Sequence, residues 1–239
     1  MELQRLLSLT RQAVDEYGMI EEGDRIAIGI SGGKDSLTLL YALNSLKNFY
    51  PNKFEIEAVS VDVGFGMDFT PVKKLCDELH VNYTIVSTEI KTIVFDKRKE
   101  SNPCSLCAKL RKGALNEEIK RLGCNKVAYA HHKDDVVDTF MMSLFYEGRI
   151  QTLEPVTFLD GADITLIRPL IFVREAEING FKNKYNLPVV KNLCPADGYT
   201  KRQYIDDLLS RENKENPGIK DRIFTAVKKE IYKDFSKNV

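Results

Sequence analysis

Three absences narrow the function of this 239-residue chain. It carries 35 basic and 35 acidic side chains, so its formal net charge is zero, which argues against a uniformly basic nucleic-acid binder. It has no apolar run long enough to span a bilayer. Its first residues, MELQRLLSL, include polar side chains throughout and lack the apolar core of a signal peptide. We therefore expect a cytoplasmic protein without membrane association. With 43% hydrophobic and 29% charged residues, the composition is that of one large α/β domain with appended elements.

Two common phosphate-binding motifs are also absent. The sequence contains neither the GxxxxGK[ST] pattern nor the GxGxxG pattern. It does contain SGGKDS at 31–36, between an apolar run and an amphipathic run rich in leucine. Gly32 and Gly33 let the main chain approach an anion, the amides that open the following helix point at it, and Lys34 adds positive charge. This glycine turn predicts a phosphate or pyrophosphate site; the alternative is a strand-to-helix turn with chance glycines.

Apolar and amphipathic runs alternate along the chain, which is typical of a parallel sheet with right-handed crossovers. We predict strands at 24–30, 54–62, 82–86 and 126–130, and helices at 1–17, 35–46, 70–79, 105–122 and 134–145. The predicted organisation is a helical segment at 1–22, an α/β domain at 23–173 with an inserted Cys-x-x-Cys helix, and a helical extension at 174–239 that carries a further cysteine.

Polar residues follow the predicted strands, at the edge where parallel sheets bind ligands. Asp62 ends the second strand, where an acid and free backbone groups suit a ribose and an adenine; a plain strand end is the alternative. The segment AHHKDDVVDT at 130–139 follows the fourth strand. Its paired carboxylates, Asp134 and Asp135, stand at a helix start and suit Mg²⁺ beside a triphosphate. Alternatively, Asp134 only caps the helix and His131 is a buried strand-end residue.

Cysteine is scarce, and the five cysteines include a single Cys-x-x-Cys pair. Without a second pair, a closed structural zinc site is disfavoured. Cys76 and Cys124 stand in apolar surroundings typical of core thiols. Cys104 and Cys107 open a predicted helix amid basic residues, where a cytosolic protein uses thiols for a metal, a cluster or redox chemistry. With the remote Cys194 they predict either a 4Fe-4S cluster on three thiolates, leaving one open iron, or a persulfide relay.

Basic residues are unevenly distributed although the net charge is zero. They crowd two regions: Lys91, Lys97, Arg98, Lys99, Lys109, Arg111 and Lys112, and then Lys201, Arg202, Arg211, Lys214, Lys220, Arg222, Lys228 and Lys229. A local basic surface of this kind can bind a polyanion. For the second region, solvated helix faces with interleaved acids are an equally good interpretation.

Several motifs resemble those of a known enzyme family. SGGKDS matches the Ser-Gly-Gly-x-Asp-Ser signature of the PP-loop ATP pyrophosphatases, which have a Rossmann-like α/β fold (adenine nucleotide alpha hydrolase-like) and cleave ATP between its α- and β-phosphates. AHHKDDVVDT resembles a segment of the tRNA 2-thiocytidine synthetase (TtcA) family, with Ala130 and Asp138 in place of the usual glycine and glutamate. The Pro-Cys-x-x-Cys and Asn-Leu-Cys segments, FYEGR at 145–149 and RPL at 168–170 are also similar. The likeness extends from 24 to 209, with Lys191 where relatives often have a further cysteine.

The resemblance implies an ATP-dependent tRNA sulfurtransferase that adenylates cytidine 32 and replaces the oxygen at C2 with sulfur. It implies that ATP and Mg²⁺ are bound by Ser31, Gly32, Gly33, Lys34, Asp35, Ser36, Asp62, His131 and Asp135, with Asp35 and Asp135 nearest the metal. It also implies catalytic roles for Lys34, Asp35 and the three cysteines Cys104, Cys107 and Cys194, which would carry the cluster.

The partners expected from the resemblance are a tRNA and a sulfur donor such as a cysteine desulfurase. The leucine stripe of the helix at 1–17 packs either on its own core or on a second subunit, so a homodimer stays open. Other interpretations are a persulfide-based thiolase without a cluster, a relative that acts on another thio-substrate or removes sulfur, and a lysidine-synthetase-like ligase. A nucleotide-binding regulator without chemistry is the alternative from a different class.

Overall fold

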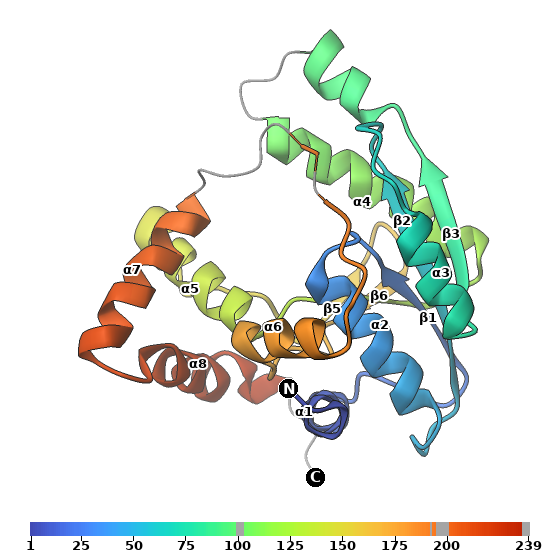
Figure 1. Cartoon of the computed structure of the whole chain (residues 1–239). Coiled ribbons are helices and arrows are strands. Elements are labelled where there is room, and N and C mark those ends of the chain that lie inside the picture. The colour runs from blue at the N-terminus through green and yellow to red at the C-terminus, as the bar shows by residue number, and fades with distance from the viewer. Residues whose placement is uncertain (99–102, 192, 195–200, 236–239) are drawn as a thin grey trace.

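One sheet, with strand order β3-β2-β1-β4-β6-β5, lies at the centre of the residues that the structure describes (Figure 1). This computed structural model describes residues 1–98, 103–191, 193–194 and 201–235. The strands are β1 (Asp24–Gly29), β2 (Phe54–Asp62), β3 (Asn82–Ser87), β4 (Lys126–Ala128), β5 (Val156–Leu159) and β6 (Ile164–Ile167). All neighbouring strands are parallel except β5, which pairs antiparallel with β6. The predicted, mainly parallel α/β fold is confirmed.

The β5–β6 hairpin is the part of the sheet that the sequence analysis did not predict. Both strands have four residues, and only 160–163 connect them. Because a parallel connection needs a crossover of a dozen or more residues, so short a link forces the antiparallel arrangement. The hairpin adds β6 beside β4 and leaves β5 at the edge of the sheet.

Helices cover both faces of the sheet, and the first and last elements of the chain are also helical (Figure 1). They are α1 (Leu3–Glu16), α2 (Lys34–Lys47), α3 (Thr70–Glu78), α4 (Pro103–Arg121), α5 (Lys133–Glu147), α6 (Glu175–Lys184), α7 (Lys201–Glu215) and α8 (Ile219–Glu230). A π-helix covers Thr92–Lys97, and a 3₁₀ turn covers Tyr232–Asp234. No helix in the described part of the chain is both long and apolar enough to cross a membrane.

The alternation of side chains along β1 decides which helices pack on which face. Ile26 and Ile28 belong to the main core, together with buried residues of α1, α2, α6 and α8. Ala27 points to the opposite face, where Leu115 and Ile119 of α4 pack on the sheet. The helix that carries the Cys-x-x-Cys pair is thereby held against the sheet on the face away from α2.

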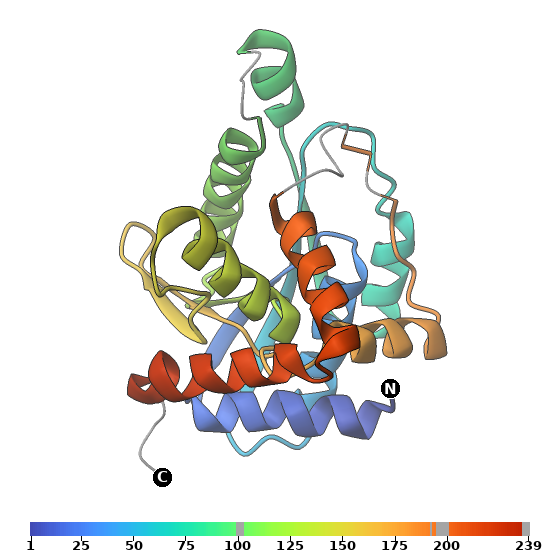
Figure 2. The ribbon, with the colours of Figure 1, turned by 90° about the vertical axis from the view of Figure 1, so that its left-hand side faces the viewer.

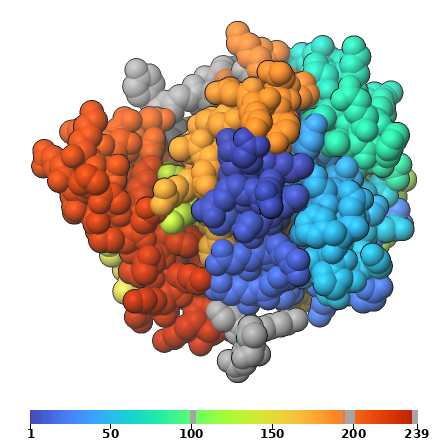
Figure 3. Space-filling model, turned by 60° about the horizontal axis from the view of Figure 1, so that its bottom comes forward, coloured from blue at the N-terminus to red at the C-terminus, as the bar shows by residue number. Residues whose placement is uncertain are grey.

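The leucine stripe of α1 packs on its own chain. Leu6, Ala13 and Val14 are completely buried in the main core. Lys228 of α8 places its Nζ 2.9 Å from the Glu16 carboxylate, and the two helices lie side by side in Figure 2. On the face seen in Figure 3, the first residues of the chain (dark blue) lie between the C-terminal helices (red) and the α2–β2 region (light blue).

Candidate active site

The glycine turn joins β1 to α2 and is closed by its own serines. The Ser36 hydroxyl accepts a hydrogen bond from Ser31 N–H at 3.2 Å, and the two hydroxyl oxygens are 3.1 Å apart. Ser31 Oγ accepts in turn from Gly33 N–H at 3.2 Å. Gly32 has φ +82°, a conformation that favours glycine. The first amides of α2 have no acceptor within the helix, so the turn presents the N–H donors that an anion requires.

The sheet fixes the entry to this turn. Ile30 N–H donates to the Val59 carbonyl at 2.8 Å, and the buried Ser60 hydroxyl donates to the Ile30 carbonyl at 2.7 Å. Tyr83 O–H donates to Ser60 Oγ at 2.7 Å. Because these partners belong to β2 and β3, the turn starts from the rigid centre of the sheet.

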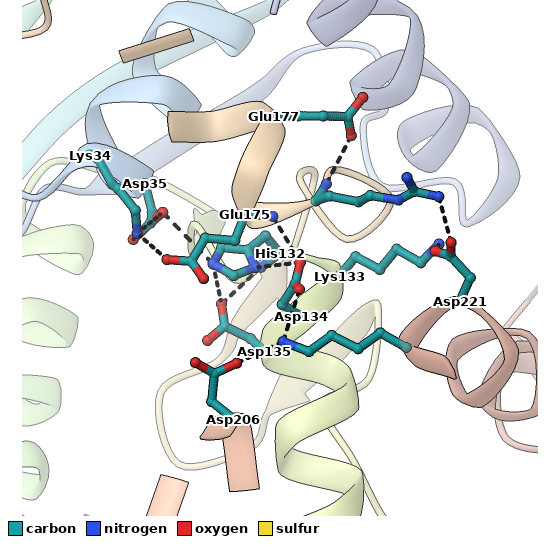
Figure 4. A network of polar contacts seen from close by, with 12 residues as sticks. Lys34, Asp35, His132, Lys133, Asp134, Asp135, Glu175, Glu177, Asp206 and Asp221 are labelled. Carbon is teal, nitrogen blue, oxygen red and sulfur yellow. Dashed lines mark hydrogen bonds and ion pairs between the residues drawn. The ribbon is translucent and has the colours of Figure 1, made fainter. Parts of the chain in front are cut away.

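Lys34 is held between two carboxylates (Figure 4). Its Nζ lies 3.0 Å from Asp35 Oδ1 and 3.0 Å from Oε1 of Glu175, the first residue of α6. Burial lowers the pKa of Lys34, but the two carboxylates outweigh burial and leave the pKa above its ordinary value. The amine therefore stays protonated at neutral pH, and a bound phosphate would compete with the carboxylates for it.

His132 stands among the carboxylates of the same network (Figure 4). Its Nε2 lies 3.4 Å from Asp135 Oδ2 and 3.8 Å from Asp35 Oδ1. Asp135 Oδ2 also accepts His132 N–H at 3.0 Å, which satisfies an amide at the start of α5. Asp134 Oδ2 accepts Glu175 N–H at 2.8 Å, so this carboxylate ties α5 to α6 instead of capping α5. The predicted pair Asp35 and Asp135 thus flanks one imidazole.

His131 is half-buried beyond the carboxyl end of β4 and is neutral near pH 7. Arg168 Nε–H donates to its Nδ1 at 3.3 Å, and the Tyr129 ring packs edge-on at 5.8 Å between centroids. Burial, followed by the positive charge of Arg168, lowers the pKa of His131 to about 4. A neutral imidazole whose Nδ1 accepts from Arg168 has its proton on Nε2. Arg168 therefore sets which nitrogen of His131 can donate.

A cavity of about 560 Å³ connects the glycine turn with α4. One side is formed by the sheet edge, the turn and the start of α5: Gly29, Ile30, Ser31, Asp35, Ser36, Val59, Val61, Tyr129, Ala130, His131 and Asp135. The other side is formed by Ala108, Arg111, Lys112 and Leu115 of α4. Hydroxyls and carboxylates thus face two cations across a space of nucleotide size. The sequence analysis named Arg111 and Lys112 only as part of a basic region.

The structure places Cys104 and Cys194 close enough to Cys107 for their charges to influence its pKa. Cys104 is exposed and Cys107 half-buried near the start of α4, and Cys194 is half-buried. Burial raises the pKa of Cys107, Arg111 opposes this, and the charges of Cys194 and Cys104 raise it further, so that it lies above the ordinary value. Cys194 therefore lies near Cys107, although 87 positions separate them in the sequence.

Cys107 rests on a small apolar cluster of its own. The cluster joins the end of β2 to the π-helix and the start of α4, and contains Val63, Ile90 and Val94 with Phe65, Phe95, Leu106, Cys107 and Leu110 around them. Cys76 and Cys124 lie elsewhere and are buried, and burial raises their pKa values to about 12 and about 11. They are core thiols, as predicted.

The donors present suit two different metal groups. Cys104, Cys107 and Cys194 form a set of soft sulfur ligands, the kind that iron–sulfur clusters use. Among the described residues, no three His, Cys, Asp or Glu side chains converge to hold one metal ion. Cysteines on a cluster need no such convergence, because each binds a different iron. Asp35 and Asp135 offer two carboxylates, which fits Mg²⁺, an ion that keeps several waters and also takes phosphate oxygens.

Contacts on either side of Cys194 in the chain reach the glycine turn and α5. Val190 N–H donates to the Gly32 carbonyl at 2.9 Å. Beyond Cys194, Arg202 in the first turn of α7 donates to Asp135 Oδ1 at 2.8 Å and to Thr139 Oγ1 at 3.2 Å. Cys194 follows Val190 by four residues, so the segment that carries this thiol starts from the glycine turn. Local sequence patterns give no signal for either contact.

Asp138, the residue that replaces the family's usual glutamate, is buried in α5 with 7% of its surface exposed. Its Oδ1 has no hydrogen-bond partner among the described residues. Burial raises the pKa of Asp138 to about 7, and Lys220 opposes this shift. A carboxyl with this environment carries a proton during part of the neutral pH range.

Other predicted residues lie near the cavity but do not line it. Asp62 Oδ1 accepts Gly64 N–H at 2.9 Å, which closes the turn after β2. The residues that line the 560 Å³ cavity do not include Asp62, nor do they include Gly32, Gly33 or Lys34 of the glycine turn. Their contacts with a nucleotide stay predictions.

The basic region at 201–229 is interleaved with acids. Arg202 pairs with Asp135 at 2.8 Å. Lys220 places its Nζ 2.7 Å from Asp206 Oδ1, and Lys228 pairs with a carboxylate of α1. These pairs favour the second interpretation of that region, because much of its positive charge is already matched.

Comparisons with known proteins agree with this geometry. The PP-loop domain family matches residues 4–211. The tRNA-cytidine(32) 2-sulfurtransferase of Geobacter sulfurreducens is 37% identical over 220 residues, which cover 90% of this chain and 86% of the relative. The enzyme of the same name from Citrifermentans bemidjiense is 34% identical over 227 residues, covering 93% and 89%.

Two solved structures share the fold. The U34-tRNA thiolase NcsA from Methanococcus maripaludis, solved with its 4Fe-4S cluster, superposes with a TM-score of 0.77 at 24% identity, covering 96% of this chain and 78% of that one. The NH₃-dependent NAD synthetase from Campylobacter jejuni superposes with a TM-score of 0.53 at 16% identity, covering 98% and 95%. The matched family and the identity with curated relatives over nearly the whole length lead to one conclusion: this chain belongs to the tRNA-cytidine(32) 2-sulfurtransferase family of PP-loop proteins.

Proposed function

We propose that this chain is an ATP-dependent tRNA sulfurtransferase that activates C2 of cytidine 32 with ATP and replaces its oxygen with sulfur. The observation that carries this proposal is the cavity that joins the glycine turn to α4, together with the approach of Cys194 to Cys107. The cavity reaches Ala108, the residue after Cys107, so an ATP-splitting site and a sulfur-handling site would lie next to each other. The names of the curated relatives supply the tRNA and the position of the base.

The first half-reaction takes place at the glycine turn. The carbonyl oxygen at C2 of the base attacks the α-phosphorus of ATP, an O–P bond forms, and the bond to pyrophosphate breaks. The turn amides and Lys34 offset the charge that develops on the leaving pyrophosphate. Asp35 and Asp135 would hold Mg²⁺ on the phosphates, and Arg111 and Lys112 would meet charge from the α4 side.

The second half-reaction delivers sulfur to the activated carbon. Cys104, Cys107 and Cys194 would hold a 4Fe-4S cluster, and the chemistry that such a cluster would supply is the binding of sulfide. Sulfide attacks C2, the C–O bond breaks, and AMP leaves with the former base oxygen. The raised pKa of Cys107 favours a cluster over a persulfide relay, because a free thiol of raised pKa is a poor nucleophile, whereas a bound metal deprotonates it.

The test separates the two half-reactions. The protein is purified without oxygen, iron and acid-labile sulfide are counted, and about four irons per chain are expected for the cluster. Unmodified tRNA is then incubated with protein, ATP, Mg²⁺ and sulfide, and its nucleosides are analysed by mass spectrometry for 2-thiocytidine. Replacing Cys194 with serine should remove the thiolated product, while tRNA-dependent exchange of pyrophosphate into ATP continues.

A matched control uses a thiol outside the site. Cys124→Ala removes a buried cysteine from the link between α4 and β4 and should leave iron content and product unchanged. Full thiolation by a protein without iron would replace the cluster with the persulfide route. Full activity of all three cysteine variants with lysine as the nucleophile would favour a lysidine-type ligase.

A further inference from the structure

The end of α5 and the start of α7 expose large aromatic and apolar side chains on a common surface. Phe145 and Tyr146 are 52% and 44% exposed, and Ile150, just beyond α5, is 76% exposed. Tyr204 in the first turn of α7 is 54% exposed. Together with Lys201 we call these residues the aromatic face; the helices α5 and α7 that carry it lie at the left of Figure 1. Large apolar side chains that are exposed singly are common on protein surfaces, whereas a contiguous group of them indicates an interaction site.

A cation accompanies the rings of the aromatic face. Lys201 Nζ lies 4.6 Å from the centroid of the Tyr146 ring, and helical spacing places Tyr204 one turn after Lys201. An exposed cation–π contact contributes little to folding, so stability does not explain why these rings stay at the surface. Rings that stack on bases, beside cations that meet phosphates, are the means by which proteins hold unpaired RNA.

The aromatic face adjoins the active site. Arg202, next to Lys201 in the chain, contacts Asp135 of the cavity wall at 2.8 Å. A base that enters the cavity leaves its neighbours in the RNA outside, at the surface beside the entrance. The first turn of α7 thus carries both Lys201 of the aromatic face and Arg202 at the cavity wall, so nucleotides that flank a bound base can reach the face.

Charge favours RNA over a second copy of this chain as the occupant. Within 144–150 and 201–204, the cations are Arg149, Lys201 and Arg202, of which Arg202 is paired with Asp135, and the one carboxylate is Glu147. Two such surfaces brought face to face would repel each other, whereas a phosphate backbone would be attracted.

We propose that the aromatic face stacks unpaired bases of the tRNA loop that flank the modified base. This rests on the proposed function for the identity of the RNA, but not for the contact itself. Tyr146 and Tyr204 supply the stacking surfaces, and Lys201 meets the adjoining phosphate.

The test compares two labelled RNAs by fluorescence anisotropy at fixed salt: a hairpin with a cytidine-containing single-stranded loop, and a fully paired duplex of equal length. The double variant Tyr146→Ala/Tyr204→Ala should weaken hairpin binding by about tenfold or more, as expected for lost base stacking, without weakening duplex binding equally. Tyr146→Phe keeps a ring and should bind the hairpin as the wild type does. Phe49→Ala removes a ring that is 50% exposed beyond the end of α2, and is the matched control.

Each outcome decides the proposal. Equal hairpin affinity of the wild type and the double variant overturns it. A lower mass of the double variant in sedimentation, with unchanged hairpin affinity, identifies the face as an interface between copies and also overturns it. A wild type that binds the hairpin through these rings but forms no thiolated product supports the aromatic face and refutes the proposed function.

Discussion

Replacing Gly32 with alanine tests the link between the glycine turn and the Cys194 segment. Gly32 has φ +82°, where a residue with a Cβ is strained by about 1–2 kcal/mol. A Cβ added there would stand 3.1 Å from Val190 Cβ and 3.3 Å from Val190 Cγ2, so Val190 must move. Overpacking of this kind costs about 1–3 kcal/mol. We expect Gly32→Ala to lower the free energy of unfolding by about 2–5 kcal/mol in total.

Gly33→Ala is the matched control. Gly33 has φ −81°, which any residue adopts, and an added Cβ would lie 3.4 Å from Ser31 Oγ, an ordinary contact. Alanine there restricts the unfolded chain and should change stability by less than about 1 kcal/mol, in the stabilising direction. The two variants carry the same added methyl group on adjacent residues, so their difference isolates the conformation of Gly32 and the approach of Val190.

The assay is urea unfolding of both variants, monitored by circular dichroism. The slope m of the free energy of unfolding against urea concentration is compared between them. Because Val190 N–H binds the Gly32 carbonyl and Cys194 follows four residues later, Gly32→Ala should also lower iron retention after anaerobic reconstitution. Equal stability of the two variants within about 0.5 kcal/mol would refute the reasoning on backbone strain. Unchanged iron retention in a destabilised Gly32→Ala would refute the link to the third cysteine.

Three further predictions concern titration and charge at the site. Burial raises the pKa of Asp138 from 3.8 to about 7, so the folded state binds this proton more tightly and the free energy of unfolding falls as pH rises through that interval. In urea unfolding, the stability of Asp138→Asn relative to wild type should therefore increase by at least about 1 kcal/mol between pH 5 and pH 8. A stability difference that is the same at both pH values would contradict this. His131 should be neutral at pH 7 with its proton on Nε2 because Arg168 donates to Nδ1, and ¹⁵N NMR showing a protonated Nδ1 would refute the assignment. Glu175→Gln removes a carboxylate that competes for Lys34, so the KM for ATP should fall by up to about fivefold, whereas a rise would indicate that Glu175 helps to hold the nucleotide.

The elements that form from local signals could be predicted from the sequence. The strand at 54–62 has the predicted bounds, and the helices around the glycine turn and the Cys-x-x-Cys pair begin within two residues of the predicted positions. The β5–β6 hairpin was missed because its strands have four residues each, although Asp160-Gly161 between them is a recognised hairpin signal. Arg111 could also have been predicted as a residue of the site, because it lies one helical turn after Cys107 on the same side of α4.

The contacts between distant segments could not be predicted in the same way. Neither hydrophobic periodicity nor turn chemistry indicates that Val190 lies over Gly32, or that the first residue of α6 pairs with Lys34. These pairings depend on how α6 and the segment after it cross the end of the sheet. Local sequence patterns therefore single out the glycine turn and the three cysteines, whereas the contacts of their segments come from the fold; the roles of these residues stay predictions.

The structure shows contacts of the glycine turn and of Asp135 with residues on either side of Cys194 in the chain. The segment with Cys194 is attached upstream to the Gly32 carbonyl through Val190, and downstream to Asp135 through Arg202. A Mg²⁺–nucleotide that engages Asp135 must compete with Arg202, and one that reshapes the turn must move the Gly32 carbonyl. Either change shifts an attachment point of the third cysteine. If ATP binds at the turn as proposed, we expect its binding to alter the position of Cys194, which would suit a reaction in which the base is activated before sulfur is delivered.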